Sequence, residues 1–183
     1  MAGRQSAMNT PNSGLLAGAN EFVRSVIAEL SALGIERHEL SLCDHLCVRA
    51  NSAEEYLESV KQISAFAHVI DTSEVNGRAI TTLEFDTPLV AAGFSVPWVE
   101  VAEPKAGSPY PSGLEHAEFV PAMAMTTFLN RHRDLPFDLK AWSKPINPDA
   151  RLPLDAGSVR FHDVSLGATV RIAAAVAGDR AGT

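Results

Sequence analysis

Residues 110–120, YPSGLEHAEFV, decide the fold of this chain when they are compared with residues 41–50, SLCDHLCVRA. Apolar and polar residues alternate in both stretches, which is typical of β-strands. Each stretch also contains an acidic residue followed by a histidine, Asp44-His45 in the first and Glu115-His116 in the second. These matching pairs indicate that the chain contains two copies of one structural unit.

The segments after the first stretch are predicted to form a helix and three strands. Asn51 or Ser52 caps the helix AEEYLESVKQIS, because a short polar side chain can accept a backbone hydrogen bond there. The dipeptide Asn76-Gly77 supplies the positive φ values of a tight turn between the first two strands. The three predicted strands are AHVIDTSEV, AITTLEFD and GFSVPWVEV.

The segments after the second stretch repeat this order. PAMAMTTFLNRHRD is predicted to be a helix, and the Pro-rich KPINPDARLPLDAG a loop. The predicted strands of this half are FDLKAW, GSVRFHDV and GATVRIAA. The sequence therefore predicts two βαβββ modules, at about residues 41–102 and 113–174.

A helix is predicted ahead of the first module. Apolar residues recur at three- and four-residue intervals from Leu15 to Leu33, and the pattern stops at Gly34. Residues 1–13 and 175–183 are rich in small and polar residues, so we expect both ends to be flexible. We expect residues 14–174 to form a single α+β domain.

The composition excludes several classes of function. Hydrophobic residues make up 46% of the chain and charged residues 20%, as in globular proteins. The net charge of -7 argues against nucleic acid and membrane surfaces as partners. We expect a cytoplasmic protein, because no apolar run approaches the roughly 18 residues of a membrane span and the N-terminus lacks a signal-peptide core. Cys43 and Cys47 are then expected to be reduced.

Several stretches resemble the YecM-like family of the vicinal oxygen chelate superfamily, which includes glyoxalase-like and extradiol dioxygenase-like proteins. The pattern YP-x-G-x-EH is the most specific of them, and the resemblance covers about residues 41–155. It implies paired βαβββ modules that form a half-open curved sheet around a metal. It also implies His45, Glu100 and His116 as metal ligands. The matching stretches are DHLCVRA, NGRAI, FSVPWVEV, YPSGLEHAEFV and ARLP.

The fourth ligand is the point at which the sequence departs from the family pattern. Family members carry a basic-aromatic-His ending on the last strand, whereas the predicted last strand reads ATVRIAA and places Arg171 and Ala173 there. His162 lies one predicted strand earlier, and it becomes the fourth ligand only if the strand boundaries differ. The expected site therefore has three ligands.

The residues themselves support a site on one face of the two matching strands. Alternate strand residues share a face, so His45, Cys47 and Arg49 point one way, as do His116 and Glu118 on the second strand. Cys47 is expected to be a buried thiol rather than a ligand. The opposite faces are predicted to pack into the core through Leu46, Val48, Ala117 and Phe119.

Other polar residues have predicted supporting roles. Asp44, Glu115 and Glu118 are the candidates for accepting a hydrogen bond from the second nitrogen of a ligating histidine. Glu118 is alternatively a general base. Arg49 and Arg171 are the candidates for binding an anionic group of the substrate. The remaining histidines are expected at the surface: His38, His68 and His132.

Two imidazoles and one carboxylate form a ligand set that suits non-haem Fe(II), although Zn, Mn, Ni and Co accept similar ligands. The sequence favours an Fe(II)-type oxidoreductase or oxygenase acting on a small oxygenated molecule, as a monomer or homodimer. Two alternatives stay open. One is a metal-dependent isomerase or lyase in which Glu118 moves a proton. The other is a non-catalytic small-molecule binding protein with a degenerate metal site.

Overall fold

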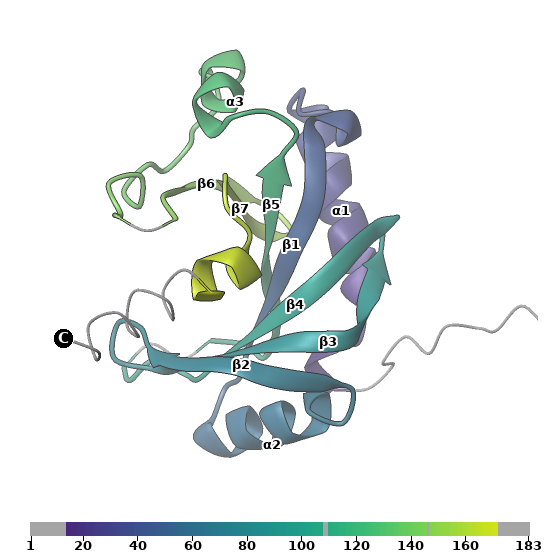
Figure 1. Cartoon of the computed structure of the whole chain (residues 1–183), viewed down its shortest axis with the longest axis vertical. Helices are drawn as coiled ribbons and strands as arrows, with labels where there is room; N and C mark the ends of the chain where they lie inside the picture. The colour runs from purple at the N-terminus through teal and green to yellow at the C-terminus, as the bar shows by residue number, and fades with distance from the viewer. Residues whose placement is uncertain (1–13, 108–109, 146, 172–183) are drawn as a thin grey trace, which may run out of the picture.

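The computed structural model describes residues 14–107, 110–145 and 147–171. One curved sheet of seven strands runs through it, with helices packed around it (Figure 1). The two ends that were expected to be flexible, 1–13 and 175–183, lie outside the described residues. The elements are η1 (Gly14–Leu16), α1 (Ala19–Ala32), η2 (Arg37–Glu39), β1 (Leu40–Arg49), α2 (Ala53–Ile63), β2 (Ala67–Glu74), β3 (Ala79–Ala91), β4 (Phe94–Ala102), β5 (Gly113–Pro121), α3 (Met125–Arg131), β6 (Asp149–Leu154) and β7 (Gly157–His162).

The strands lie in the order β2-β3-β4-β1-β5-β7-β6. β1 runs parallel to β4, and β5 runs parallel to β7 in the same way. The two halves meet where β1 pairs with β5 in antiparallel orientation. The predicted α+β fold, with paired modules, a curved open sheet and an N-terminal helix, is confirmed.

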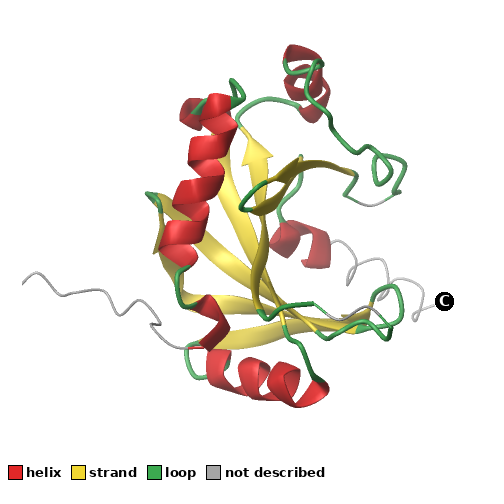
Figure 2. Ribbon diagram, turned by 180° about the vertical axis from the view of Figure 1, so that it is seen from behind, coloured by secondary structure: helices red, strands yellow, loops and turns green. Residues whose placement is uncertain are grey.

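Helix α1 covers one face of this sheet (Figure 2). Its apolar stripe is buried there through Val23, Val26 and Leu30. The helix ends where Gly34 adopts a φ of 85°, and the N–H of Ile35 returns to the carbonyl of Leu30 at 2.9 Å. Glycine takes such a positive φ without a steric penalty, which explains why the helical pattern stops at this residue.

Two local predictions in the first module agree with the structure. Of the two cap candidates for α2, Ser52 is the cap, because its hydroxyl accepts the N–H of Glu55 at 3.1 Å. Asn76 and Gly77 have φ values of 54° and 77° in the turn between β2 and β3. Among the described residues, no helix is long and apolar enough to cross a membrane.

The second module differs from the prediction in three places. Residues 137–142 contain no strand, only a single bridge from Asp138 to Arg151. The strand β6 instead lies within the Pro-rich segment that was predicted to be a loop. Pro153 is tolerated there because β6 is the edge strand of the sheet, where a missing N–H leaves no neighbouring strand unpaired.

The last predicted strand, GATVRIAA, is also wrong. Residues 166–171 are helical, and the Ser165 hydroxyl accepts the N–H of Ala168 at 3.3 Å at the start of this helix. Ser165 is therefore a helix-start signal that the alternating pattern concealed. β7 is then the last described strand of the module, so the second unit reads β-α-β-β followed by a helix.

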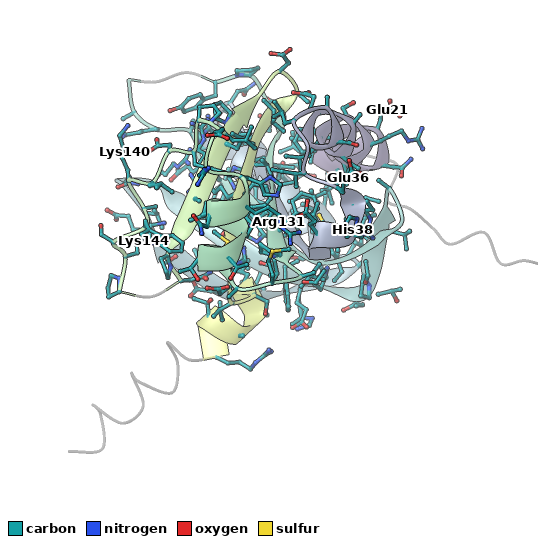
Figure 3. The ribbon with its side chains drawn as sticks, turned by 90° about the horizontal axis from the view of Figure 1, so that it is seen from above. Glu21, Glu36, His38, Arg131, Lys140 and Lys144 are labelled. Atoms are coloured by element: carbon teal, nitrogen blue, oxygen red, sulfur yellow. The ribbon has the colours of Figure 1, made fainter. Side chains whose placement is uncertain are left out.

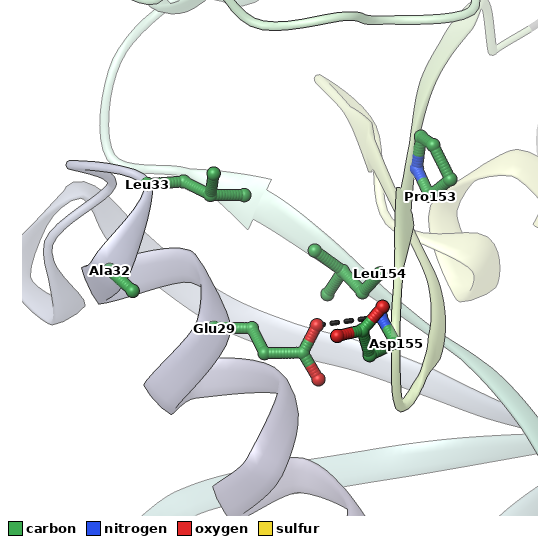
Figure 4. Close-up of a pocket in the computed structure, with 6 residues that line it drawn as sticks. All are labelled: Glu29, Ala32, Leu33, Pro153, Leu154 and Asp155. Carbon is green, nitrogen blue, oxygen red and sulfur yellow. Dashed lines mark hydrogen bonds between the residues drawn. The ribbon is translucent and has the colours of Figure 1, made fainter.

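The carboxylate of Glu29 joins α1 to the turn between β6 and β7. It accepts the backbone N–H groups of Asp155 at 2.7 Å and Ala156 at 2.9 Å. A pocket of about 380 Å³ lies at this junction (Figure 4). Its lining residues are Glu29, Ala32, Leu33, Pro153, Leu154 and Asp155.

The end of α3 packs beside the segment that precedes β1 (Figure 3). Buried Glu39 accepts a hydrogen bond from Arg131 at 2.8 Å and lies 3.2 Å from Nε2 of His132. The prediction that His132 is a surface residue is therefore wrong, since only 8% of its side chain is exposed. His38 and His68 are exposed, as predicted.

Candidate metal centre

Strands β1, β4 and β5 bring the three predicted ligands together at the middle of the sheet. The ligand atoms of His45, Glu100 and His116 all lie within 4.8 Å of one another. The strand register explains this proximity, because Cys47 of β1 lies between Glu100 on one neighbouring strand and His116 on the other. On the opposite face Leu46 is buried in the core, as its alternation predicts.

His162 joins this cluster from the end of β7. It forms a second group with Asp44 and His45 whose ligand atoms also lie within 4.8 Å of one another. The strand ends with Arg160-Phe161-His162, which is the basic-aromatic-His ending expected for the family. The triplet was missed because the last strand was assigned to residues 167–174.

The last described strand therefore ends at His162 and does not include Arg171. Arg171 is exposed on the helix after β7. The prediction that it lies on a strand lining the site is wrong. Ala173 lies outside the described residues. The end of the last described strand, where the family pattern has its fourth ligand, is occupied by Arg160, Phe161 and His162.

Each of the three histidines has one nitrogen held by the protein. Nδ1 of His45 donates to Asp44 at 2.9 Å, Nδ1 of His116 to Glu115 at 3.1 Å, and Nδ1 of His162 to the carbonyl of Val164 at 2.7 Å. Asp44 and Glu115 were among the candidate acceptors. Carboxylates and carbonyls accept hydrogen bonds, so each Nδ1 carries a proton, and deprotonation of Nε2 would leave there the lone pair that a metal ion takes.

The three Nε2 atoms are buried and have no hydrogen-bond partner among the described residues: those of His45, His116 and His162. Buried polar atoms without partners are rare in folded proteins. A histidine whose Nδ1 is held by a carboxylate or carbonyl, while its Nε2 is left open, is arranged as metal-binding histidines are. The residues present therefore fit a divalent metal ion.

Glu118 lies among these imidazoles. Its carboxylate oxygens are 3.6 Å from Nε2 of His45, 3.2 Å from that of His116 and 3.2 Å from that of His162. Burial raises the pKa of Glu118, but the neighbouring histidines lower it further, so the pKa lies well below its usual range. The group is therefore a carboxylate, available to face a cation.

The same charges act on the histidines. Burial lowers the pKa of His45, but Glu118 and Glu100 raise it, and the pKa lies well above its usual value. Glu118 and Glu100 thus surround His45 with negative charge, which would also attract a metal cation.

Asp44 lies at an irregularity in the β1–β5 pairing, between Cys43 and His45. Simple alternation places Asp44 on the face opposite His45, together with Leu46. In the structure its Oδ2 instead accepts from His45 and from the backbone N–H of Leu166, both at 2.9 Å. The bulge explains this departure, because an extra residue changes the side to which a side chain is directed.

The helix that begins at Leu166 covers the Trp98 end of the centre. A Cβ placed on Gly167 would lie 2.2 Å from Cζ2 of Trp98, so only a glycine fits against the indole. Trp98 pairs in register with His45, which places the indole beside the cluster.

Arg49 and Cys47 lie toward the opposite end of β1. Arg49 forms an ion pair with Glu115, and its guanidinium carbon lies 4.0 Å from the centre of the Tyr110 ring. Cys47 is buried, as predicted, with its sulfur 4.0 Å from Glu115. Arg49 therefore acts on the carboxylate that orients His116.

A family model described as "YecM protein" matches residues 12–172. The chain belongs to the YecM family. This confirms the predicted membership of the YecM family. A search of curated proteins gave no match.

Solved structures resemble this fold. "Protein EC4020" has a TM-score of 0.63 at 21% identity, over 92% of this chain and 98% of that one. A putative dioxygenase from Bacillus subtilis has a TM-score of 0.43 at 9% identity, over 70% and 43%. The fosfomycin resistance protein FosX from Listeria monocytogenes, with Mn(II), has a TM-score of 0.25 at 13% identity, over 70% and 96%. The first of these supports the fold alone.

Proposed function

We propose that this YecM-family protein is a metal-dependent enzyme acting on a small oxygenated molecule. The observation that carries the proposal is the set of three buried Nε2 atoms without hydrogen-bond partners around one carboxylate. In this proposal His45, Glu100 and His116 hold the ion, and His162 is the fourth ligand.

The donor set favours Fe(II), because the proposed ligands are imidazoles and a carboxylate. Zn, Mn, Ni and Co accept the same donors. When bound, such an ion would activate an oxygen-bearing substrate or dioxygen. The favoured reaction is therefore an oxidation of the non-haem Fe(II) type.

The chain's own residues would orient the ligands and handle protons. Asp44 and Glu115 hold the rings of His45 and His116 in one tautomer. Arg49 keeps Glu115 in place through its ion pair. Glu118, within 3.6 Å of three imidazoles, is either an additional ligand or a base.

A metal-dependent isomerase or lyase is the second candidate. It is supported by the position of Glu118, because a buried carboxylate beside the ligands can move a proton on a bound substrate. Such a reaction would not consume dioxygen, whereas the oxygenase reaction would. Oxygen uptake by the iron-loaded protein, measured with an electrode, therefore separates the two candidates.

The experiment that tests the site is anaerobic reconstitution followed by elemental analysis. We expect about one divalent ion per chain in the wild type. Each of the variants His45→Ala, Glu100→Ala and His116→Ala should lower occupancy, and His162→Ala tests the fourth ligand. His68→Ala, which removes an exposed histidine, is the matched control. Full occupancy in the His116→Ala variant would exclude the proposed site, and an empty reconstituted wild type would leave a non-catalytic binding protein.

A further inference from the structure

Arg160 faces the candidate metal centre from the side opposite Glu100. In the first module Cys47 of β1 pairs with Glu100, and in the second module Glu118 of β5 pairs with Arg160. Cys47 and Glu118 each come two residues after the ligand histidine of their strand. Arg160 therefore occupies in the second module the position that a candidate ligand carboxylate occupies in the first.

The guanidinium of Arg160 is only partly satisfied by the protein. Nη1 donates to Oδ1 of Asp149 at 3.0 Å. Nε is buried and has no hydrogen-bond partner among the described residues. Its distance of 3.6 Å from Oε1 of Glu118 is too long for a hydrogen bond. Nε and Nη2 form the side of the guanidinium that binds a carboxylate through two parallel hydrogen bonds.

The charge and the open Nε of this arginine suit an anionic group of a ligand. A guanidinium stays protonated and cannot ligate a metal ion. Asp149 and Glu118 already offset part of its repulsion from a divalent cation, and an anionic group of a ligand would offset more of it. The 30% exposure of its side chain leaves it within reach of a ligand that enters from solvent.

The balance of charge also indicates how large that anion's charge should be. Five carboxylates lie in and beside the centre, on Asp44, Glu100, Glu115, Glu118 and Asp149. Three basic side chains accompany them, on Arg49, Arg160 and Lys144. A divalent ion makes this set neutral, so a monoanion adds one unit of negative charge and a dianion adds two. A singly charged carboxylate is therefore favoured over a phosphonate dianion.

We propose that Arg160 binds a carboxylate group of the substrate, which makes the substrate a small carboxylic acid with a neighbouring hydroxyl or keto oxygen for the metal. This inference rests on the proposed function, because it places the substrate between the ion and the guanidinium. Arg160 then selects substrates that carry a carboxylate, and the histidines and Glu100 bind the metal ion.

The test is calorimetric titration of the zinc-loaded protein, since zinc does not react with oxygen. Lactate and propane-1,2-diol share one scaffold and differ by a carboxylate in place of a hydroxymethyl group. We expect lactate to bind more tightly than the diol. Arg160→Gln should weaken lactate binding by roughly 10- to 100-fold, as expected for lost hydrogen bonds to a charged group, and leave diol binding unchanged. Arg24→Gln, at an exposed arginine of α1, is the matched control.

The outcomes separate this inference from the proposed function. A wild-type protein that binds no divalent ion overturns both. A zinc-loaded protein with equal affinity for lactate and the diol, or an unchanged lactate affinity in Arg160→Gln, overturns only the role of Arg160. Tighter binding of (1-hydroxyethyl)phosphonate overturns the choice of a monoanion. If Arg160→Gln does not fold, Arg160→Lys keeps the charge without the fork, and the wild-type comparison of lactate with the diol still decides.

Discussion

The backbone N–H of Leu166 donates to Oδ2 of Asp44 at 2.9 Å, across 122 positions of the chain. The same oxygen accepts Nδ1 of His45 at 2.9 Å. One carboxylate therefore orients a candidate metal ligand and anchors the helix that begins at Leu166. This connection links the proposed metal centre to the end of the described chain.

Replacement of Asp44 should weaken metal binding without removing a proposed ligand. In Asp44→Ala, His45 loses the acceptor that holds its tautomer, and we expect metal affinity to fall roughly 10- to 100-fold. Competition titration with a chromophoric chelator measures this change. Asp71→Ala, at an exposed carboxylate of β2, is the control. Unchanged affinity in Asp44→Ala would show that the orientation of His45 does not depend on this contact.

Enlargement of Gly167 should displace the helix that covers Trp98. In Gly167→Ala the new Cβ would lie 2.2 Å from the indole, so the helix or the ring must move. We expect the free energy of unfolding to fall by about 1–3 kcal/mol, as for other overpacked sites. Urea unfolding monitored by tryptophan fluorescence measures the change in the free energy of unfolding, and the emission of the folded protein reports the displacement around Trp98. Arg171→Ala changes an exposed residue of the same helix, and it should alter neither stability nor metal affinity.

The Glu39 cluster should make stability depend on pH. Burial raises the pKa of Glu39, but hydrogen bonds from the backbone of Glu36 and from Arg131 and His132 lower it further, so the net pKa is below its usual value. A carboxylate with a depressed folded-state pKa contributes stability that is fully present above its unfolded value of 4.5. That contribution is lost as the pH falls through the folded-state pKa.

The variant Glu39→Gln tests this expectation. At pH 7 it should lower the free energy of unfolding by about 1.5–3 kcal/mol, the range for hydrogen bonds to charged groups. The difference from the wild type should shrink at a pH below the folded-state pKa, because Glu39 is then protonated in both states. Urea unfolding curves at several pH values measure it, and Glu74→Gln, at an exposed site, is the control. A difference that does not change with pH would contradict the role of the charge.

The Glu29 carboxylate should stabilise the turn between β6 and β7. In Glu29→Ala the backbone N–H groups of Asp155 and Ala156 lose their acceptor. We expect a loss of about 1–2 kcal/mol, because two hydrogen bonds to a charged group are removed, one of them exposed and one part-buried. Chemical denaturation of this variant beside Glu21→Ala, on the exposed side of the same helix, measures the loss. Equal stabilities for the two variants would show that the junction contributes nothing.

The local patterns of the chain predicted the first module better than the second. The strands around Asn76-Gly77 and the helix capped by Ser52 carry clear turn and capping signals, and both occur. The segment around Pro153 was predicted to be a loop, because proline disfavours a strand unless the strand lies at a sheet edge. Which strand forms the edge depends on tertiary pairing.

The candidate site shows the same division. His45 and His116 were recognised because each follows an acidic residue in a matching strand, and Glu100 because of the family resemblance. His162 was only a conditional fourth ligand, and Arg160 was not a candidate, because GATVRIAA alternates like a strand, although Ser165 begins a helix there. The missing information was the pairing of β5 with β7, which places both residues beside Glu118.

The sequence by itself determined the repeated unit, the face of β1 and β5 that carries the histidines, and three acidic candidates for holding their rings. Periodicity and residue order are local properties, so they can be recognised without coordinates. Only the tertiary structure decided that β7 is the last strand of the described chain and that His162 joins the cluster. It also placed Arg160 opposite Glu100, because the register between strands is set by packing across the whole sheet.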